Sequence, residues 1–342
     1  MLAAVLQGKE QLRVEPVSIP LVQPGDVLVR VRAALTCGTD VKVFRRGYHA
    51  RMIQPPAVFG HEFAGDIVAL GAGVTGFRRQ DRVVAANSAP CQTCYYCRRG
   101  QQNLCDDLLF NNGAYAEYIR IPARIVEQNM HVLPDHVSYL DGALVEPLAC
   151  VVRGLEETGV RAGDTLAVIG LGAIGLMFVR LAKLQGAEVI AIGRRQTQLD
   201  RAAAMGADHL ISTEGDISPV EPVRELTRRR GVDVAIEAVG SPEVWEHAVQ
   251  MVRRGGTVNF FGGCPSNTKV SLDTNLLHYS EITCKASFHH TPAHIREAFE
   301  CICRGEITAR DFVNRVEPLT KILEVMQHLM SHNGHLKTAI LP

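Results

Sequence analysis

A glycine-rich turn between an apolar strand and a helix constrains the fold more than any other feature. The predicted strand Thr165–Ile169 runs directly into G-L-G-A-I-G at positions 170–175, and a helix follows to about residue 184. The first glycine of this spacing permits a tight turn, the second lets the backbone approach a pyrophosphate, and the third lets the helix pack on the sheet. Ordinary turns can also contain G-x-G-x-x-G, but the flanking strand and helix favour a dinucleotide site. The predicted cofactor-binding residues of this turn are Gly170, Gly172, Ala173, Ile174 and Gly175.

Strands and helices alternate after this turn. Apolar runs at 188–192, 209–211, 232–237 and 257–261 are separated by helical patterns at 198–205, 223–229 and 244–252. Strands joined by helices of this length need crossover connections, which place the strands parallel to one another. The pattern predicts a doubly wound α/β sheet.

The first 150 residues have a different rhythm. Short branched or alternating runs at 14–19 and 27–33 are split by prolines and glycines, and glycines keep interrupting the sequence as far as residue 76. This density predicts an antiparallel, barrel-like domain with tight turns. A chain of 342 residues is long enough for two domains. The C-terminal tail is expected to carry a helix near 295–303 and a last strand at 336–341.

Composition excludes several kinds of partner. The chain has 36 Lys and Arg against 36 Asp and Glu, so no face can be strongly basic without an acidic excess elsewhere, which argues against nucleic acid. Its apolar runs are broken by glycines and are too short to span a membrane. The first residues lack the basic segment of a signal peptide, so we expect a cytoplasmic location. The ten cysteines are then expected to be free thiols or metal ligands.

Four of the cysteines form a compact pattern, C-x2-C-x2-C-x7-C. Four thiolates this close in sequence can complete a tetrahedral shell, as in closed structural zinc sites. An iron–sulfur cluster is a possible alternative, but the last gap is longer than in the ferredoxin run and no proline follows the fourth cysteine. The pattern predicts one structural zinc ion, which would tie down a loop with little core of its own. The predicted ligands are Cys91, Cys94, Cys97 and Cys105.

Cys37 and His61 suggest a second metal site. A thiolate and a neutral imidazole are natural zinc ligands, and they leave room for a carboxylate and a substrate oxygen. Taken singly, a cysteine is more often a small buried hydrophobe and a histidine more often a satisfied core residue. The metal interpretation is favoured by the joint occurrence of Cys37 and His61 with the wider pattern of motifs described below.

The end of the second parallel strand indicates which dinucleotide is bound. A site for NAD needs a carboxylate there, which accepts from the ribose 2′-hydroxyl. This sequence has Gly193 at that position, followed by Arg194 and Arg195. Two guanidinium groups suit a 2′-phosphate, although solvated arginines are the alternative. We therefore favour NADP(H) over NAD(H).

Taken together, the motifs resemble those of the zinc-containing medium-chain dehydrogenase/reductase superfamily. The stretch G-H-E-F-A-G at 60–65, followed by Gly71 and Val74, is similar to the zinc signature of that family. The four-cysteine pattern and the 170–175 turn then follow in the family's order. The strings C-G-T-D at 37–40 and V-E-P-L at 145–148 are most similar to the polyol (sorbitol), threonine and butanediol dehydrogenases.

The resemblance implies a two-domain α/β architecture. A GroES-like β-barrel catalytic domain would comprise residues 1–153 and the returning segment 288–342. A Rossmann coenzyme domain with a doubly wound parallel sheet would comprise residues 154–287. The resemblance also implies one catalytic and one structural zinc ion per chain, a small-molecule alcohol, polyol or ketone substrate, and a homo-oligomer, either a dimer or a tetramer.

The resemblance assigns roles to the residues of the second metal site. Cys37, His61 and Glu146 correspond to catalytic-zinc ligands, and Glu62 to a carboxylate that ligates transiently or orients the site from beside it. Thr39 corresponds to the hydroxyl that takes the substrate proton. Cys150 lies near the position where other alcohol dehydrogenases have a cysteine ligand, but the Glu-Pro-Leu string favours Glu146.

Two departures from the family pattern concern the proton relay and the region after residue 287. Lys42 occupies the place of a relaying histidine and is included among the candidate catalytic residues, with His49 or water as other possible relays. Phe288-His289-His290 stands where polyol dehydrogenases have Phe-Arg, and a plain structural role for these histidines is equally open.

The implied activity is zinc-dependent hydride transfer between a secondary alcohol or polyol and NADP(H) or NAD(H). Zinc lowers the pKa of a bound water from about 15.7 to about 7 and acts on an alcohol in the same sense. Two alternatives are a zinc-free quinone or enoyl reductase and an inactive cofactor-binding homologue. The complete set of Cys37, His61 and Glu146 argues against both.

Overall fold

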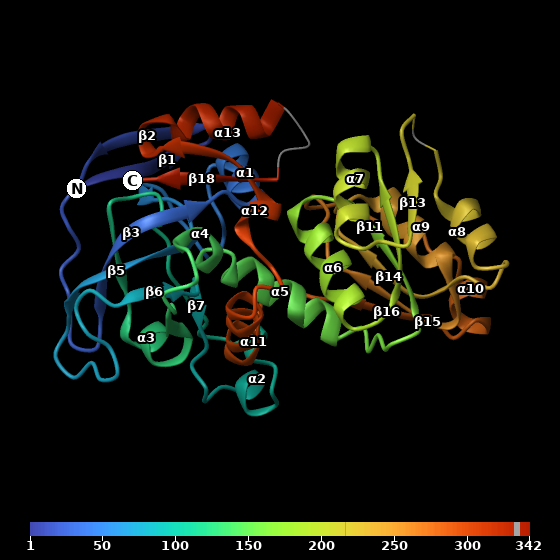
Figure 1. The fold of residues 1–342 in the computed structure, drawn as a ribbon, viewed down its shortest axis with the longest axis horizontal. Coiled ribbons are helices and arrows are strands. Elements are labelled where there is room, and N and C mark those ends of the chain that lie inside the picture. Colours follow the sequence, from blue (N-terminus) through green and yellow to red (C-terminus); the bar gives the residue numbers. More distant parts are fainter. Residues whose placement is uncertain (216, 332–335) are drawn as a thin grey trace. The chain divides into compact units, whose positions relative to one another are not determined.

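The computed structural model describes residues 1–215, 217–331 and 336–342. The chain divides into two compact units, the first formed by Met1–Ala149 with His290–Pro342 and the second by Cys150–His289 (Figure 1). Among the described residues, no helix combines the length and the apolar character that a bilayer crossing demands.

The first unit is built on antiparallel β-structure, as the sequence predicts for its N-terminal part. Its main sheet has the order β10-β6-β5-β3-β18-β17, with β9 also pairing with β3, and a smaller sheet has the order β2-β1-β4. Strands β17 and β18 pair in parallel, whereas the other paired strands of this unit are antiparallel. The strands are β1 (Leu2–Gly8), β2 (Gln11–Pro16), β3 (Val27–Leu35), β4 (Ala57–Val58), β5 (Glu62–Leu70), β6 (Arg82–Ala85), β9 (Tyr118–Ile121), β10 (Met130–Val132), β17 (Val313–Pro318) and β18 (Lys337–Leu341).

Strand β3 lies at the centre of this unit. It pairs with β5, β9 and β18, all antiparallel, and its valines are buried while Arg30 and Arg32 are exposed. Such alternation buries one face of a strand against the core. The core on that side includes Phe44, Phe63 and Tyr115, all almost fully buried.

The local sequence explains where the helix that follows Cys37 begins and ends. Sγ of Cys37 accepts from the amide of Thr39 at the start of helix α1 (Gly38–Arg46), and the carboxylate of Asp40 accepts from the amide of Cys37. The helix ends before Gly47, which has a φ of 89°. A glycine accepts this left-handed conformation without the penalty that a Cβ would bring. The other elements of the unit are β7 (Ser88–Ala89), α2 (Tyr95–Arg98), η1 (Gln102–Leu104), β8 (Leu109–Phe110), α3 (Ala123–Asn129), α4 (Tyr139–Gly142), α11 (Pro292–Cys303), α12 (Ala309–Phe312), η2 (Leu319–Lys321) and α13 (Ile322–Ser331).

The second unit contains the predicted doubly wound sheet. Its six strands have the order β13-β12-β11-β14-β15-β16, and every neighbouring pair is parallel. The strands are β11 (Thr165–Ile169), β12 (Glu188–Gly193), β13 (His209–Ser212), β14 (Val232–Glu237), β15 (Val252–Phe260) and β16 (Thr283–Ala286). The helices are α6 (Ala173–Leu184), α7 (Gln196–Ala204), α8 (Val220–Leu226), α9 (Pro242–Met251) and α10 (Thr274–Tyr279), and α5 (Val145–Glu156) runs from the first unit into this one.

The central strands are buried on both faces, which explains their uninterrupted apolar sequences. The sequence missed the edge strand β16, whose four residues are all exposed and therefore lack an apolar pattern. It also placed a helix at 223–229, whereas α8 ends at Leu226. The hydroxyl of Thr227 bonds the carbonyl of Val223, and Arg228 and Arg229 then adopt positive φ values of 52° and 66°, which ends the helix.

Candidate metal centres and coenzyme site

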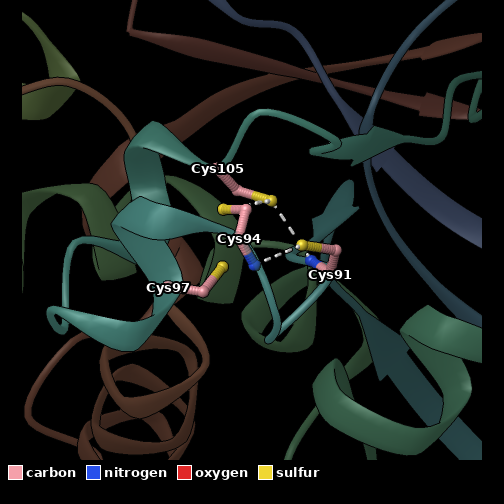
Figure 2. Close-up of side chains that lie close together, drawn as sticks. All are labelled: Cys91, Cys94, Cys97 and Cys105. Atoms are coloured by element: carbon pink, nitrogen blue, oxygen red, sulfur yellow. Dashed lines mark hydrogen bonds between the residues drawn. The ribbon is translucent and has the colours of Figure 1, made fainter.

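The four cysteines of the first unit converge on one point. Their sulfur atoms all lie within 4.8 Å of one another, and Figure 2 shows the side chains of Cys91, Cys94, Cys97 and Cys105 turned toward a common centre. The short elements α2 and η1 between them hold the loop in this shape. All ten cysteines of the chain are free thiols. This donor set fits a closed tetrahedral zinc ion.

Backbone amides donate hydrogen bonds to the sulfur atoms of this cluster, which favours the negatively charged thiolate form. The amide of Cys91 donates to Sγ of Cys105 at 3.2 Å, and the amide of Cys94 donates to Sγ of Cys91 at 3.3 Å (Figure 2). Hydrogen bonds from Thr93, through its hydroxyl and its amide, lower the pKa of Cys91 to about 6. Burial raises the pKa of Cys97 to about 12. The ligands of a metal ion must be thiolates, so the amide donors favour the form that binds.

Strand pairing brings the second set of ligands together. Leu35 at the end of β3 lies opposite Glu62 at the start of β5, and this register places Cys37 beside His61. One ligand atom from each of Cys37, His61 and Glu62 lies within 4.8 Å of the others. His61 is 4% exposed and Glu62 is fully buried. The mixture of a thiolate, an imidazole and a carboxylate fits zinc.

Glu146 is not a member of this 4.8 Å group. It stands in the first turn of α5, is 6% exposed, and its Oε1 lies 3.5 Å from Nε2 of His290. Nε2 of His290 also lies 3.2 Å from Oδ1 of Asn87. Burial would raise the pKa of Glu146, but the hydrogen bond from His290 and the charges of His61 and His290 lower it below its ordinary value. Glu146 is therefore a buried carboxylate close enough to His61 for their charges to interact.

Asp40 holds His61 in one orientation, a contact that the sequence did not predict. Its Oδ1 lies 3.0 Å from Nδ1 of His61, while its Oδ2 accepts from the amide of Cys37 at 3.0 Å and from the hydroxyl of Tyr115 at 2.6 Å. Burial alone would lower the pKa of His61, but the charge of Asp40 raises it well above its ordinary value. With Nδ1 engaged by Asp40, Nε2 is the nitrogen left for a metal ion.

Glu62 is bound by a buried lysine from a distant strand. Nζ of Lys337 lies 2.7 and 2.6 Å from the two carboxylate oxygens of Glu62 and 3.2 Å from the carbonyl oxygen of Thr36. Burial raises the pKa of Glu62 to about 7 against the pull of Lys337. Burial would lower the pKa of Lys337, but the charge of Glu62 raises it, so the amine stays protonated.

The glycine-rich turn of the second unit borders a cavity of about 470 Å³. Gly170 has a φ of 95°, and a Cβ on Gly175 would lie 1.8 Å from the carbonyl oxygen of Gly170, so neither position accepts a larger residue. Around Gly172, by contrast, there is open space next to the cavity. Gly193, Arg194 and Arg195 also line this cavity.

Comparison with known proteins identifies the family. Residues 23–134 match the alcohol dehydrogenase GroES-like domain, and residues 173–304 match the zinc-binding dehydrogenase domain. Sorbitol dehydrogenase of Bacillus subtilis (strain 168) is 30% identical over 350 residues, covering 100% of this chain and 97% of that protein. The chain belongs to the zinc-binding alcohol dehydrogenase family, in the medium-chain dehydrogenase/reductase superfamily.

Other members of this family agree in sequence and in fold. D-arabitol-phosphate dehydrogenase of Enterococcus avium is 32% identical over 335 residues, covering 95% of this chain and 93% of that protein. A protein of Sinorhizobium meliloti 1021, classed with the zinc-binding dehydrogenases and solved with NADP bound, has a TM-score of 0.91 at 30% identity and covers 100% of this chain and 99% of that one. The predicted GroES-like domain and Rossmann sheet are thereby confirmed.

The residues considered for proton transfer in this dehydrogenase lie around helix α1. Thr39 is half-buried in the first turn, with its amide 3.4 Å from Sγ of Cys37. Lys42 is exposed on the same helix. His49 follows the helix in a loop, where its Nδ1 accepts from the amides of Arg51 and Met52 at 3.3 and 3.1 Å. Burial and the charges of Arg46, His61 and Arg51 lower the pKa of His49.

Proposed function

We propose that this enzyme oxidises a secondary alcohol or polyol to the ketone, passing hydride to NADP⁺, and catalyses the reverse reduction. The observation that carries the proposal is the group formed by Cys37, His61 and Glu62, whose ligand atoms lie within 4.8 Å of one another in a family of zinc-binding dehydrogenases. The names of the relatives, sorbitol dehydrogenase and D-arabitol-phosphate dehydrogenase, favour a polyhydroxylated substrate.

Each unit supplies one part of the chemistry. The unit Met1–Ala149 with His290–Pro342 is inferred to be the catalytic domain, and Cys150–His289 the coenzyme domain. Cys37, His61 and Glu146 would hold the catalytic metal, with Glu62 beside it. When bound, zinc acidifies a hydroxyl group that it ligates. The structural ion would be held by Cys91, Cys94, Cys97 and Cys105.

The chain's own groups orient the catalytic centre and receive the proton. Asp40 fixes the ring of His61, and Lys337 neutralises Glu62, so that two of the acidic groups near the centre are already paired. The hydroxyl of Thr39 would accept the proton of the substrate alcohol, and His49 would carry it onward in place of Lys42, which is exposed. The carbinol carbon then loses hydride to the nicotinamide ring.

Two arginines support the choice of NADP⁺. Gly193 offers no carboxylate for a ribose hydroxyl, and a Cβ there would lie 2.9 Å from the side chain of Leu171. Arg194 and Arg195 line the coenzyme cavity, and within the described parts of the chain neither forms an ion pair. Unpaired guanidinium groups are available to a phosphate. The relative from Sinorhizobium meliloti was solved with NADP.

The proposal is tested with the full chain and a panel of substrates. Sugar alcohols, cyclitols, amino-polyols and small secondary alcohols are offered at alkaline pH with NADP⁺, and the absorbance of the reduced nicotinamide is followed. Metal analysis should find two zinc ions per chain, and Cys37→Ala should retain one and lose turnover. Cys284→Ala, an exposed cysteine outside both centres, is the matched control and should keep both ions and full activity. Wild-type turnover by Cys37→Ala would overturn the assignment.

We also propose that the enzyme is a cytoplasmic homo-oligomer, a dimer or a tetramer. Ten free cysteines suit a reducing compartment. Strand β16 is an exposed sheet edge, and neighbouring Tyr279 is 75% exposed, which favours a protein contact there. Sedimentation of the purified enzyme as a monomer at micromolar concentration would contradict the oligomer.

A further inference from the structure

We propose that Tyr115 is a positioning residue of the catalytic metal centre, which holds Asp40 in place so that Asp40 can orient His61 for the metal ion. This inference rests on the proposed function, because it assumes that Cys37 and His61 bind a metal. It goes beyond that function in giving a role to a residue that acts on the proposed ligand His61 through Asp40.

The hydroxyl of Tyr115 is the first member of a continuous hydrogen-bonded chain. It lies 2.6 Å from Oδ2 of Asp40 and 3.1 Å from the carbonyl oxygen of Leu35. A phenol has one proton to donate, and the shorter contact is the one to the carboxylate. The other oxygen of Asp40 lies 3.0 Å from Nδ1 of His61. Tyr115, Asp40 and His61 are each at most 4% exposed, so water does not compete for these bonds.

The backbone around Tyr115 fixes the position of its ring. The amide of Tyr115 donates to the carbonyl of Phe59, and the amides of Gly113 and Ala114 donate to that of Gly60. Gly60 has a φ of 90°, and a Cβ on it would lie 2.7 Å from the ring of Tyr115. The ring therefore lies directly on the residue that precedes His61. Phe59 completes the packing, edge to face at 5.8 Å.

The hydroxyl matters because Asp40 is a buried carboxylate with few donors. Without Tyr115, the bond from the amide of Cys37 would be the one that Oδ2 keeps among the residues that the structure describes. A carboxylate that is less firmly held can rotate, and His61 would lose its fixed orientation. Changes in the direct outer partner of a metal-binding histidine, here Asp40, typically weaken metal affinity by about 10- to 100-fold, and a loss of the orientation of Asp40 should have an effect of that order.

Tyr115→Phe separates this role from simple packing, since it removes only the hydroxyl. Tyr139→Phe is the matched control, because Tyr139 donates its hydroxyl to Asp66 in the same unit, away from the centre. The measurement is the rate of zinc release to a chromogenic chelator, with Cys37→Ala identifying the phase that belongs to the structural ion. Tyr115→Phe should release the catalytic ion at least 10-fold faster, while Tyr139→Phe should release it at the wild-type rate.

A second readout reports on geometry rather than on stability. The visible d–d spectrum of the enzyme with cobalt in the catalytic site should shift in Tyr115→Phe and stay unchanged in Tyr139→Phe. Unchanged zinc release and an unchanged cobalt spectrum in folded Tyr115→Phe would overturn the inference. If that variant does not fold, 3-fluorotyrosine at position 115 keeps the hydroxyl and makes it a stronger donor; slower zinc release then supports the inference, and an unchanged rate overturns it.

These outcomes distinguish the inference from the proposed function. A wild-type enzyme that carries only the structural ion defeats the proposed function itself. If the wild-type enzyme binds two zinc ions and Tyr115→Phe also binds two and releases them at the wild-type rate, only the role of Tyr115 is refuted.

Discussion

Nζ of Lys337 contacts both carboxylate oxygens of Glu62, at 2.6 and 2.7 Å, although 275 residues separate the two side chains. The contact exists because β18 pairs with the end of β3, with Ala339 opposite Leu35. The amide of Thr338 donates to the hydroxyl of Thr36, and the amide of Thr36 donates to the carbonyl of Thr338. Lys337 is 3% exposed and Glu62 is fully buried, so each charge depends on the other.

Lys337→Met should strongly destabilise the unit formed by Met1–Ala149 and His290–Pro342. The substitution keeps the side chain's length but leaves the carboxylate of Glu62 buried without its partner, which costs about 3–5 kcal/mol. Thermal unfolding followed by calorimetry is the measurement. Adding Glu62→Gln should recover much of the loss, because the unpaired charge is then gone. Lys9→Met, at an exposed lysine of the same unit, should leave the melting temperature unchanged; an equally small effect of Lys337→Met would contradict the ion pair's importance.

Cys94→Ser should lower the thermal stability of the protein, chiefly by making the loop that carries the four cysteines less ordered. The loop from Cys91 to Cys105 contains only the short elements α2 and η1, so an opened thiolate site leaves it untethered. The expected result is a lower melting temperature together with faster proteolysis at residues 92–104. Cys264→Ser, outside both metal centres, serves as the comparison. Unchanged melting of Cys94→Ser would count against a structural ion.

Arg195→Ala should change coenzyme preference. A charge-assisted hydrogen bond to a phosphate contributes about 1.5–3 kcal/mol, so KM for NADP⁺ should rise about 10-fold or more while KM for NAD⁺ stays nearly constant. Arg194→Ala tests the second guanidinium in the same way. Arg228→Ala, at an exposed arginine that does not line the cavity, should affect neither coenzyme. A wild-type enzyme that prefers NAD⁺, or an equal loss for both coenzymes, would refute the assignment.

Asp233 should contribute stability that depends on pH. Its oxygens accept from the amide of Thr165 at 2.8 Å and from Arg253 at 2.5 Å. Burial would raise the pKa of Asp233, but these two donors lower it below its ordinary value of 3.8. Its contribution is therefore present above pH 3.8 and is lost as the pH falls through the lower, folded pKa.

Asp233→Asn should consequently cost about 1 kcal/mol at neutral pH and much less in acid. Melting temperatures measured from pH 7 down to pH 3 test this, because the difference between the wild type and the variant should shrink as the pH falls below 3.8. Glu214→Gln, at an exposed carboxylate of the same unit, is the control. Curves that stay parallel over the whole range would disprove the linkage.

The parts of the fold that sequence predicts are those encoded locally. The turn at 170–175 follows strand β11 as expected, because the strand, the glycines and the helix are contiguous. The cluster of four cysteines is predictable for the same reason, because its members lie close together in the sequence. Strand β16 escaped prediction because all of its residues are exposed, and the end of α8 escaped it because a hydroxyl of Thr227 competes for the backbone.

The residues that support the catalytic centre were not predictable in this way. Asp40 was visible only as part of a motif, and nothing near it in the sequence indicates that it meets Tyr115, which is 75 residues away. Lys337 resembles any lysine in a short terminal strand until the pairing of β18 with β3 is known. Such contacts depend on strand register across the whole sheet, so a single sequence does not reveal them.

The pairing of Lys337 with Glu62 also determines when this ion pair can form while the chain is being synthesised. Cys37, His61 and Glu62 emerge from the ribosome first, yet the lysine that neutralises Glu62 is made 275 residues later, after the whole of the unit Cys150–His289. At usual elongation rates that delay is on the order of half a minute. Until β18 is made, the first unit lacks the strand that lies between β3 and β17 in the folded sheet, so β3 has no partner where β18 will pair. The unit Cys150–His289 is already complete by then and can fold first, whereas the main sheet of the first unit cannot be completed before its C-terminal strand is made.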